Sequence, residues 1–444
     1  MLRNYLKIAL RNLRREPLYA GINISGLAVG LACCLLIAIY VHRELSYDDF
    51  HREADRVYRV VTDVEQTDSA SKLATGSPEY GRVLRQLFPQ AQTVLRMIEW
   101  SDVSVEHGGE HFYDEQFLYA EPTFFDVFSF ELRRGNLATA LEEPFSLVIT
   151  PEVKKKYFGD EPALGQTLTL NGDRTFTVTG VLERPPGPTH LPLDILVSWS
   201  TWETLPEGRT RSWGGLYAYT YVLPSEGVSQ SQFQQKLADV FPDPVRERLD
   251  EMGMEMSLQL EPLTSIYLTS DRRYDIASTG DEQYVYLFVG VALLILLIAC
   301  ANFVNLATAR SVDRAGEVGV RKSVGSTRGD LAAQFLTESL LTTTLAFGAA
   351  LILVALAMPY FNDFAGTALS LGTLPLPVLG GIVVGGILAV GLLAGSYPAF
   401  ALSRFRPSEV LRGSLDRTAG RQGLHQGLVV VQFAMSVLLI IGSL

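Results

Sequence analysis

The chain has 444 residues, of which 48% are apolar and only 19% charged, and its formal net charge is −11. This balance indicates a membrane protein. The three cysteines, Cys33, Cys34 and Cys300, all lie in apolar runs, which excludes a disulfide framework or a zinc knuckle in the large polar region. We expect no nucleic-acid partner.

The N-terminal segment 1–17 carries five cations and a regular spacing of leucines at positions 2, 6, 10 and 13. This spacing places the leucines near one face of a helix. It predicts an amphipathic helix that lies in the membrane interface and is attracted to anionic lipid, although an ordinary basic flank is the alternative. Pro17 is expected to break this helix before the first span begins.

Four apolar runs are long enough to cross a membrane, which takes about 20 helical residues. They cover residues 18–41, 284–309, 331–358 and 376–402. The first run could instead be a signal peptide, but it is too long and no cleavage site follows it, which favours an uncleaved anchor. A fifth run begins at residue 427 and the chain stops inside it at 444, which indicates a truncated fifth span.

The distribution of Lys and Arg predicts the orientation of these spans. Five cations lie in each of the segments 1–17, 310–330 and 403–426, and none lies in the loop 359–375. Residues 42–282 hold 22 Lys and Arg against 40 Asp and Glu, a net charge of −18. We therefore expect a cytosolic N-terminus, a cytosolic linker at 403–426 and an extracytoplasmic domain at 42–282.

The segment 42–282 is long enough to have its own core. Helical periodicity covers 77–88 and 231–241, and Asn171-Gly172 predicts a tight hairpin turn. The pattern predicts strands at 57–64, 94–100, 145–150, 166–170, 175–183, 194–199, 219–223 and 256–263. Because strands and helices do not alternate strictly, we expect an α+β domain, with two lobes.

The large polar segment contains no predicted catalytic, cofactor or metal site. His107 and His111 flank two glycines, a pattern typical of a turn and unlike the helix that carries zinc ligands in metalloproteases. Residues 159–167 lack the spacing and the Lys of a phosphate-binding loop. Any ATP must therefore be bound by a partner.

A charged, glycine-containing stretch separates the second span from the third. The glycines are expected to permit turns before and after a short helix that carries the charges. These cations could serve only to set the topology, but topology needs charge and no glycines at fixed places, so we favour a docking element. Its residues are Gly316, Glu317, Gly319, Arg321, Lys322 and Gly325.

Polar residues also lie inside the predicted spans. Glu338 is an intramembrane carboxylate, which is energetically expensive, and we expect it to pair with an Arg or to hold helices together. Asn302 and Asn305 are expected to donate interhelical hydrogen bonds. Six glycines predict close packing of the fourth span, and Pro398 is expected to unwind its end; the glycines are at positions 380, 381, 385, 386, 391 and 395.

Several stretches in order resemble one known family. Residues 317–341 and 395–413 resemble the FtsX-like permease domain, and residues 47–60, 147–186 and 191–199 resemble the MacB-type periplasmic core domain. The resemblance covers nearly the whole chain and implies an ABC-transporter permease of the MacB/FtsX superfamily. The chain differs from MacB in lacking an N-terminal ATPase domain. The start of a fifth span makes the chain similar to a long subgroup in which two permease units are fused. The chain would then contain the first unit and the beginning of the second.

The resemblance implies the permease subunit of a bacterial inner-membrane complex in which a separate ABC-type ATPase binds ATP. Such permeases work as dimers or pseudo-dimers and transmit motion to their outer domain, for export or mechanotransmission of amphiphilic, peptide-like or envelope molecules. Segment 316–325 would dock on the ATPase, and partners could include a membrane-fusion protein or an outer-membrane channel. The alternatives are an FtsX-like regulator of cell-wall enzymes and a Lol-like permease for lipoprotein release.

Overall fold

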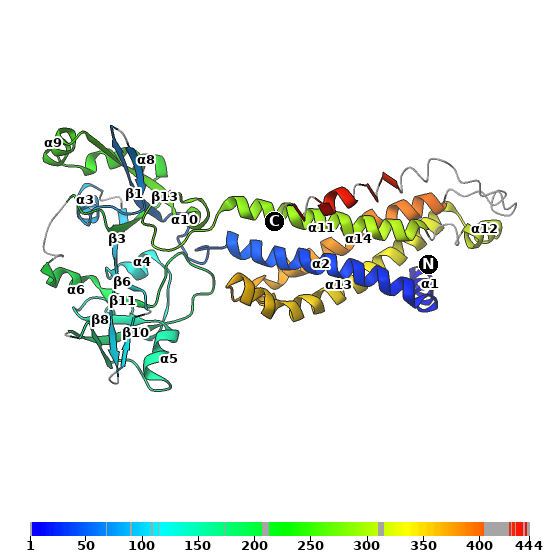
Figure 1. Ribbon diagram of the computed structural model, residues 1–444, viewed down its shortest axis with the longest axis horizontal. Helices are drawn as coiled ribbons and strands as arrows, with labels where there is room; N and C mark the ends of the chain where they lie inside the picture. The colour runs from blue at the N-terminus through cyan, green and yellow to red at the C-terminus, as the bar shows by residue number, and fades with distance from the viewer. Residues whose placement is uncertain are drawn as a thin grey trace. The chain divides into compact units, whose positions relative to one another are not determined.

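The computed structural model describes residues 2–67, 69–88, 91–107, 110–113, 115–172, 174–206, 213–309 and 315–403, and short helical pieces between 426 and 441. The chain forms two compact units. The sheet unit is Arg43–Glu282, and the helical unit consists of Met1–His42 with Gln283–Leu444. Each unit is described by itself below (Figure 1).

The helical unit contains α1 (Leu2–Arg15), α2 (Pro17–Leu45), α11 (Glu282–Ala309), α12 (Ala315–Ser323), α13 (Arg328–Ala365), the 3-10 turn η2 (Leu371–Thr373) and α14 (Leu376–Ser403). Among the described residues, α2, α11, α13 and α14 are long and apolar enough to cross a membrane, which confirms the four predicted spans. Pro17 begins α2, where its missing N–H costs no helical hydrogen bond, so α1 ends just before it.

The predicted linker and fifth span lie largely outside the described residues. Of the segment 403–426 only its two end residues are described, and of 427–444 the residues described are 427, 429–430, 432–437 and 440–441, all of them helical.

The core of the helical unit is formed by apolar side chains from all four spans. Leu31 and Ile39 of α2, Phe303 of α11, Phe347 of α13 and Val390 of α14 belong to one buried cluster. The spans thus bury their contacts on one another and leave other faces apolar and exposed, as a bilayer requires.

Helix α14 packs against α13 along a line of glycines. A Cβ atom at Gly386, Gly391 or Gly395 would lie 2.4 Å from Phe347 Cζ, 2.7 Å from Leu340 Cδ2 or 2.6 Å from Ser339 Cβ, respectively. These three glycines confirm the predicted close packing. The other three, at positions 380, 381 and 385, have no described atom within 4 Å of such a Cβ.

Helix α14 continues through Pro398 to Ser403, so the predicted unwinding at this proline is wrong. Its last turns are held by neighbours, since Ala394 and Ala399 are buried in the two clusters that α14 shares with α13. A proline is tolerated in a membrane helix when adjacent helices support the backbone.

The sheet unit contains the following strands: β1 (Tyr58–Gln66), β2 (Ser69–Leu73), β3 (Ala91–Trp100), β4 (Val105–His107), β5 (Glu110–Phe112), β6 (Phe117–Ala120), β7 (Leu132–Gly135), β8 (Ser146–Ile149), β9 (Thr167–Leu170), β10 (Arg174–Leu182), β11 (Ile195–Ser198), β12 (Ala218–Pro224) and β13 (Met254–Pro262). Its helices are α3 (Glu79–Leu87), α4 (Phe124–Val127), α5 (Pro151–Phe158), α6 (Trp199–Thr204), α8 (Gln230–Leu237), the 3-10 turn η1 (Ala238–Val240), α9 (Asp243–Glu251) and α10 (Leu263–Thr269).

These strands form one mixed sheet in the order β13-β1-β12-β3-β6-β11-β8-β10-β9-β4-β5, with β2 paired to β1 and β7 to β10. All eight predicted strands are present. The predicted hairpin joins β9 to β10, with positive φ at Asn171 (51°) and Gly172 (73°). The two glycines between His107 and His111 lie outside the described residues.

The predicted two lobes correspond to the two ends of this continuous sheet. One end has a core of β1, β12, β13, α3 and α8, and the other has a core of β8, β9, β10 and α5. A third cluster covers the central strands β3, β6, β11 and β12. Figure 1 shows the first end beside the labels α8 and α9 and the second beside α5.

A buried carboxylate anchors the start of the sheet unit. Asp48, which has a φ of 62°, accepts hydrogen bonds from Thr189 Oγ1 at 2.7 Å and pairs with His190 Nδ1 at 2.8 Å. His190 Nε2 in turn lies 2.8 Å from the hydroxyl of Tyr221 in β12. Burial alone would raise the pKa of Asp48, but His190, His51 and Thr189 hold this pKa well below its usual range. The segment that follows α2 is thereby tied to the sheet.

A fully buried arginine in β1 links the edge strand β13 to the segment that follows α10. Arg59 in β1 is 0% exposed and donates to Glu261 Oε2 at 2.7 Å and to Asp275 Oδ1 at 2.5 Å. Burial would raise the pKa of Asp275, but the hydrogen bonds and charge of Arg59 lower it below its ordinary value of 3.8. This network satisfies a charge that would otherwise be very costly to bury.

We expect Arg59→Met to destabilise the sheet unit by about 3–5 kcal/mol at neutral pH, because Glu261 and Asp275 would stay buried without their cation. The contribution of Asp275 is complete above its unfolded pKa and is lost as the pH falls through its lower folded pKa, so the difference from the wild type should shrink below about pH 4. Denaturant unfolding of the full chain, followed by circular dichroism at several pH values, measures this. Arg52→Met, at an exposed position, is the control; an equal loss from both variants would contradict the role of Arg59.

Gly391→Ala should destabilise the helical unit by about 1–3 kcal/mol, because the added methyl group would overlap Leu340. Gly385→Ala is the matched control on the same helix, where the methyl group meets no described atom. The measurement is the unfolding temperature of both variants in detergent. Similar shifts for the two variants would show that the glycine line is not a packing surface.

Candidate functional site

The predicted docking element forms helix α12, one side of which is buried. Val318 is only 2% exposed and clusters with Leu331 and Phe335 of α13 and Ala399 of α14. Gly319 beside it is also buried. This small apolar contact fixes α12 to the ends of two membrane helices.

Two of the three predicted turn glycines are not in turns. Gly316 and Gly319 lie within α12, so their predicted role in sharp turns before the helix is wrong. Gly319 is buried beside Val318, on the side of α12 that packs against the neighbouring helices.

Gly325 makes the turn from α12 to α13. Its φ is 104°, its N–H donates to the carbonyl of Lys322 at 3.1 Å, and the N–H of Ser326 donates to the carbonyl of Arg321 at 3.0 Å. This is the Schellman arrangement that ends a helix at a glycine. Helix α13 then begins at once with a capping box, in which Thr327 and Asp330 exchange hydrogen bonds of 3.2 and 3.0 Å. The link between the two helices is therefore short and fully hydrogen-bonded.

The charged residues of α12 play different structural parts. Arg321 donates from Nη1 to Oε1 of Gln334, a buried side chain (6% exposed) on α13, and so attaches α12 to α13. Lys322 is half-buried, and its pKa is lowered by partial burial and by repulsion from Arg328. Glu317 is in the helix, but its side chain lies outside the described residues.

The other side of α12 is exposed and apolar. Val320 of α12 is 56% exposed, and Val324, in the turn directly after the helix, is 84% exposed. Because the N–H of Val324 still donates to the carbonyl of Val320 at 3.2 Å, the two side chains lie near one face. We call these two residues the α12 valine pair. The two side chains form a small exposed apolar surface on the side of α12 that faces away from α13 and α14.

Helix α1 joins the same end of the helical unit (Figure 1). The hydroxyl of Tyr5 donates to Oδ1 of Asp330 at 3.3 Å, and Ala9 is buried. Leu6 and Leu10, from the predicted apolar face, remain exposed. Asp330 thus connects α1 to the capping box that starts α13.

The polar residues inside the spans lie at helix contacts or in half-buried positions. Asn302 of α11 faces α2, since its Nδ2 atom would lie 3.3 Å from a Cβ at Gly26. Asn305 and Glu338 are half-buried. Interhelical hydrogen bonds from the two asparagines and the pairing of Glu338 remain predictions.

Sequence reasoning missed most of the residues that hold α12 in place. Val318, Gln334 and Ala399 come from separate helices and carry no local signal that they meet. Asp330 could have been found, because Thr327 and Asp330 have the spacing of a capping box directly after a turn glycine.

Comparison with known proteins adds two family matches. Residues 20–240 match the model of the MacB-like periplasmic core domain, and residues 289–407 match the FtsX-like permease C-terminal model. The first match contains all of the sheet except β13, and the second contains α12, α13 and α14.

Curated relatives share low but extended similarity. A protein of Neisseria meningitidis serogroup A named "Macrolide export ATP-binding/permease protein MacB" is 24% identical over 292 residues, which are 65% of this chain and 42% of the relative. "Macrolide export ATP-binding/permease protein MacB 1/2" of Paracoccus denitrificans is 23% identical over 392 residues, which are 85% of this chain and 54% of the relative. The chain therefore spans about half the length of the curated relatives it matches.

Two solved structures resemble part of the chain. A domain of a putative permease protein from Porphyromonas gingivalis has a TM-score of 0.42 and 24% identity, covering 48% of this chain and 91% of that chain. The periplasmic region of MacB from Actinobacillus actinomycetemcomitans has a TM-score of 0.31 and 18% identity, covering 44% and 87%. With the two domain matches in order along four apolar helices, the chain belongs to the family of membrane permeases that combine a MacB-like periplasmic core domain with an FtsX-like permease domain.

Proposed function

We propose that this chain is the permease subunit of an ABC transporter and that it passes the motion of a partner ATPase to its extracytoplasmic sheet unit. The observation that carries the proposal is the α12 valine pair, two exposed apolar side chains on α12 and the turn after it, where α12 packs against α13. Family membership supports an ATPase as the partner, because the relatives are named ATP-binding/permease proteins.

The charge distribution supports a cytosolic position for α12. Five cations lie in each of the segments 1–17, 310–330 and 403–426, whereas the loop 359–375 between α13 and α14 has none. The excess of Lys and Arg on the cytosolic side of membrane proteins favours an orientation with α1 and α12 in the cytosol. In this orientation the sheet unit is outside, and α12 faces the compartment that contains ATP.

Helix α13 can transmit a displacement of α12 across the membrane. It has 38 residues and is therefore about 57 Å long, enough to span the bilayer and extend beyond it. At its far end Asn362 exchanges hydrogen bonds with Leu369 at 2.8 and 2.9 Å, which fixes the connection toward α14. Because the link at Gly325 is short and hydrogen-bonded, we expect a displacement of α12 to be passed on to α13.

The cargo of this permease is proposed at the level of chemical class only. We infer amphiphilic, peptide-like or envelope molecules handled outside the membrane; this class is supported by the relatives that are named for macrolide export. The basic α1 helix, with Leu6 and Leu10 exposed, would lie on anionic lipid at the inner surface.

We expect the double variant Val320→Asp and Val324→Asp to abolish co-purification with a co-expressed ABC-type ATPase and the stimulation of its activity by the permease. Two carboxylates would have to be buried at the interface, which is costly without partners. The measurements are affinity co-purification and ATP hydrolysis in lipid nanodiscs. Val320→Ile with Val324→Ile is the conservative control and should retain both properties; aspartate variants that still bind and stimulate the ATPase would refute docking at this face.

Arg321→Glu and Lys322→Glu should each lower ATPase stimulation several-fold. The first variant would lose the contact that positions α12, and the second would lose a contact with the ATPase. Arg321 holds α12 through Gln334, so adding Gln334→Arg to Arg321→Glu should restore the contact and the stimulation, whereas it should not rescue Lys322→Glu. The assay is the same ATP hydrolysis measurement. Rescue of neither variant would argue that Arg321 contacts the ATPase directly and does not act by positioning α12.

A further inference from the structure

Strand β13 forms one edge of the sheet, because among the described strands it pairs with β1 alone. An edge strand exposes a row of backbone N–H and C=O groups that can pair with another chain. In β13 part of this edge is closed by side chains. Gln234 of α8 donates to the carbonyl of Leu258 at 2.7 Å and accepts from the N–H of Leu260 at 2.8 Å.

The glutamine contacts also show which residues of β13 direct their backbone away from β1. Leu258 and Leu260 do so, and backbone direction alternates along an antiparallel strand. The β1–β13 register continues without a shift to Gln66↔Met254. Met256 and Met254 therefore direct their N–H and C=O groups to the same free edge, and among the described residues no side chain closes this part of it.

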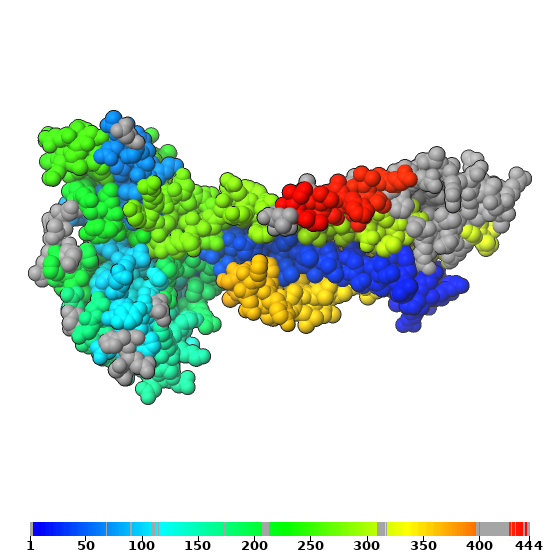
Figure 2. Space-filling view, in the orientation of Figure 1, coloured from blue at the N-terminus to red at the C-terminus, as the bar shows by residue number. Residues whose placement is uncertain are grey.

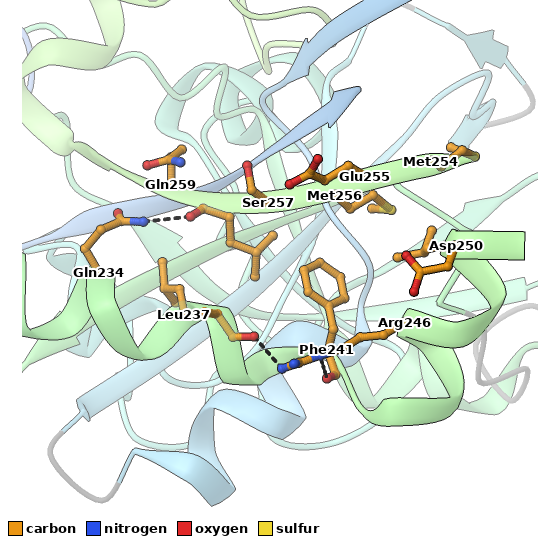
Figure 3. Close-up of a pocket in the computed structure, with 13 residues that line it drawn as sticks. Gln234, Leu237, Phe241, Arg246, Asp250, Met254, Glu255, Met256, Ser257 and Gln259 are labelled. Carbon is orange, nitrogen blue, oxygen red and sulfur yellow. Dashed lines mark hydrogen bonds between the residues drawn. The ribbon is translucent and has the colours of Figure 1, made fainter. Parts of the chain in front are cut away.

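A groove of about 470 Å³ runs beside this open part of the edge. Figure 3 shows it between β13 on one side and α8, η1 and α9 on the other, with Phe241 pointing toward the strand. Its apolar lining residues are Leu237, Ala238, Phe241, Leu249, Met254, Met256 and Leu258. A volume of this size accommodates the side chains of a short peptide segment.

Two methionines, Met254 and Met256, contribute adaptable side chains to the apolar lining. Methionine side chains are unbranched and polarisable, and they are frequent on surfaces that accept varied apolar partners.

The outer face of the same edge is acidic. Glu255 lies directly opposite Glu65 in the β1–β13 register, and both side chains are exposed. Like charges opposite each other destabilise a sheet. Asp250 and Glu255 line the groove and also an adjoining hollow with Glu65. Figure 2 shows the green surface of α8 and α9 beside the blue β1–β2 hairpin at this end of the sheet unit.

We propose that this open edge of β13 binds an extended, cationic segment of a partner polypeptide, which adds to the sheet as a further strand. The added strand would pair with the backbone of Met254 and Met256. Its alternate residues would lie on the groove side and be apolar, and the residues between them would lie beside Glu255 and be Lys or Arg. The proposal concerns the sheet unit alone and goes beyond the docking of an ATPase at α12.

A peptide fits these features better than a small amphiphile does. An amphiphile could fill the apolar lining, but it would offer no backbone groups to pair with the N–H and C=O groups of Met256. Strand addition satisfies them and simultaneously places cations beside the paired glutamates.

The test measures binding of acetylated, amidated, fluorescently labelled Val-Lys-Val-Lys-Val-Lys-Val to the full chain in lipid nanodiscs by fluorescence anisotropy. The same peptide with glutamates in place of the lysines is the charge control and should bind at least about tenfold more weakly. Two N-methylated versions test the backbone pairing. Methylation at the valines blocks antiparallel addition and methylation at the lysines blocks parallel addition, so one version must lose binding and the other must keep it.

Two charge-reversal variants locate the site. Glu255→Lys should weaken binding of the lysine peptide by about fivefold and strengthen binding of the glutamate peptide. Glu247→Lys is the matched control, since it is an exposed glutamate on α9 that does not line the groove, and it should change binding by less than about twofold. Unchanged unfolding temperatures show that both variants are folded.

The proposal is overturned if the lysine peptide does not bind at concentrations up to about 1 mM. It is also overturned if both N-methylated peptides bind as well as the parent, because the groove would then accept apolar side chains without backbone pairing, as an amphiphile site does. Equal effects of both methylation patterns, or of Glu255→Lys and Glu247→Lys, lead to the same conclusion.

Discussion

The burial of Val318 among Leu331, Phe335 and Ala399 is the contact on which the proposed coupling depends. A nine-residue helix is too short to be stable on its own in water. Its position must therefore come from packing, from the Arg321–Gln334 hydrogen bond and from the link at Gly325. Together these contacts make α12 an extension of α13 and leave the valine pair available to a partner.

Specific contacts also fix the buried polar groups of the sheet unit. Asp48 and Arg59 are both buried, and each is surrounded by partners that satisfy its charge. Asp48 fixes the segment that follows α2, and Arg59 binds residues of the segment that leads toward α11. The two places where the chain enters and leaves this unit are thus secured by buried charges, which hold a unique geometry at the cost of desolvation.

The open edge of β13 is an exception to this pattern of satisfied groups. Gln234 closes one half of the edge, and the other half borders an apolar groove and an acidic face. Proteins usually protect a strand edge with charges, bulges or a covering element. A half that is left open beside methionines is consistent with a surface whose covering element belongs to another polypeptide.

Local sequence patterns determined the four spans, the eight predicted strands and the turns at Asn171-Gly172 and Gly325, because each depends on hydropathy or backbone preference within one short segment. The strands that were missed, such as β2, β4 and β6, are short and lack alternation; β6, for example, is buried on both faces. The helix between the second and third spans was located correctly along the chain, but the positions of Gly316 and Gly319 within it were not, because a glycine in a packed helix cannot be told from one in a turn by its identity alone. Only the tertiary structure decided that Arg321 meets Gln334, that three of six glycines in α14 touch α13 and that Met256 lies at an open edge, because these facts depend on which distant segments come together.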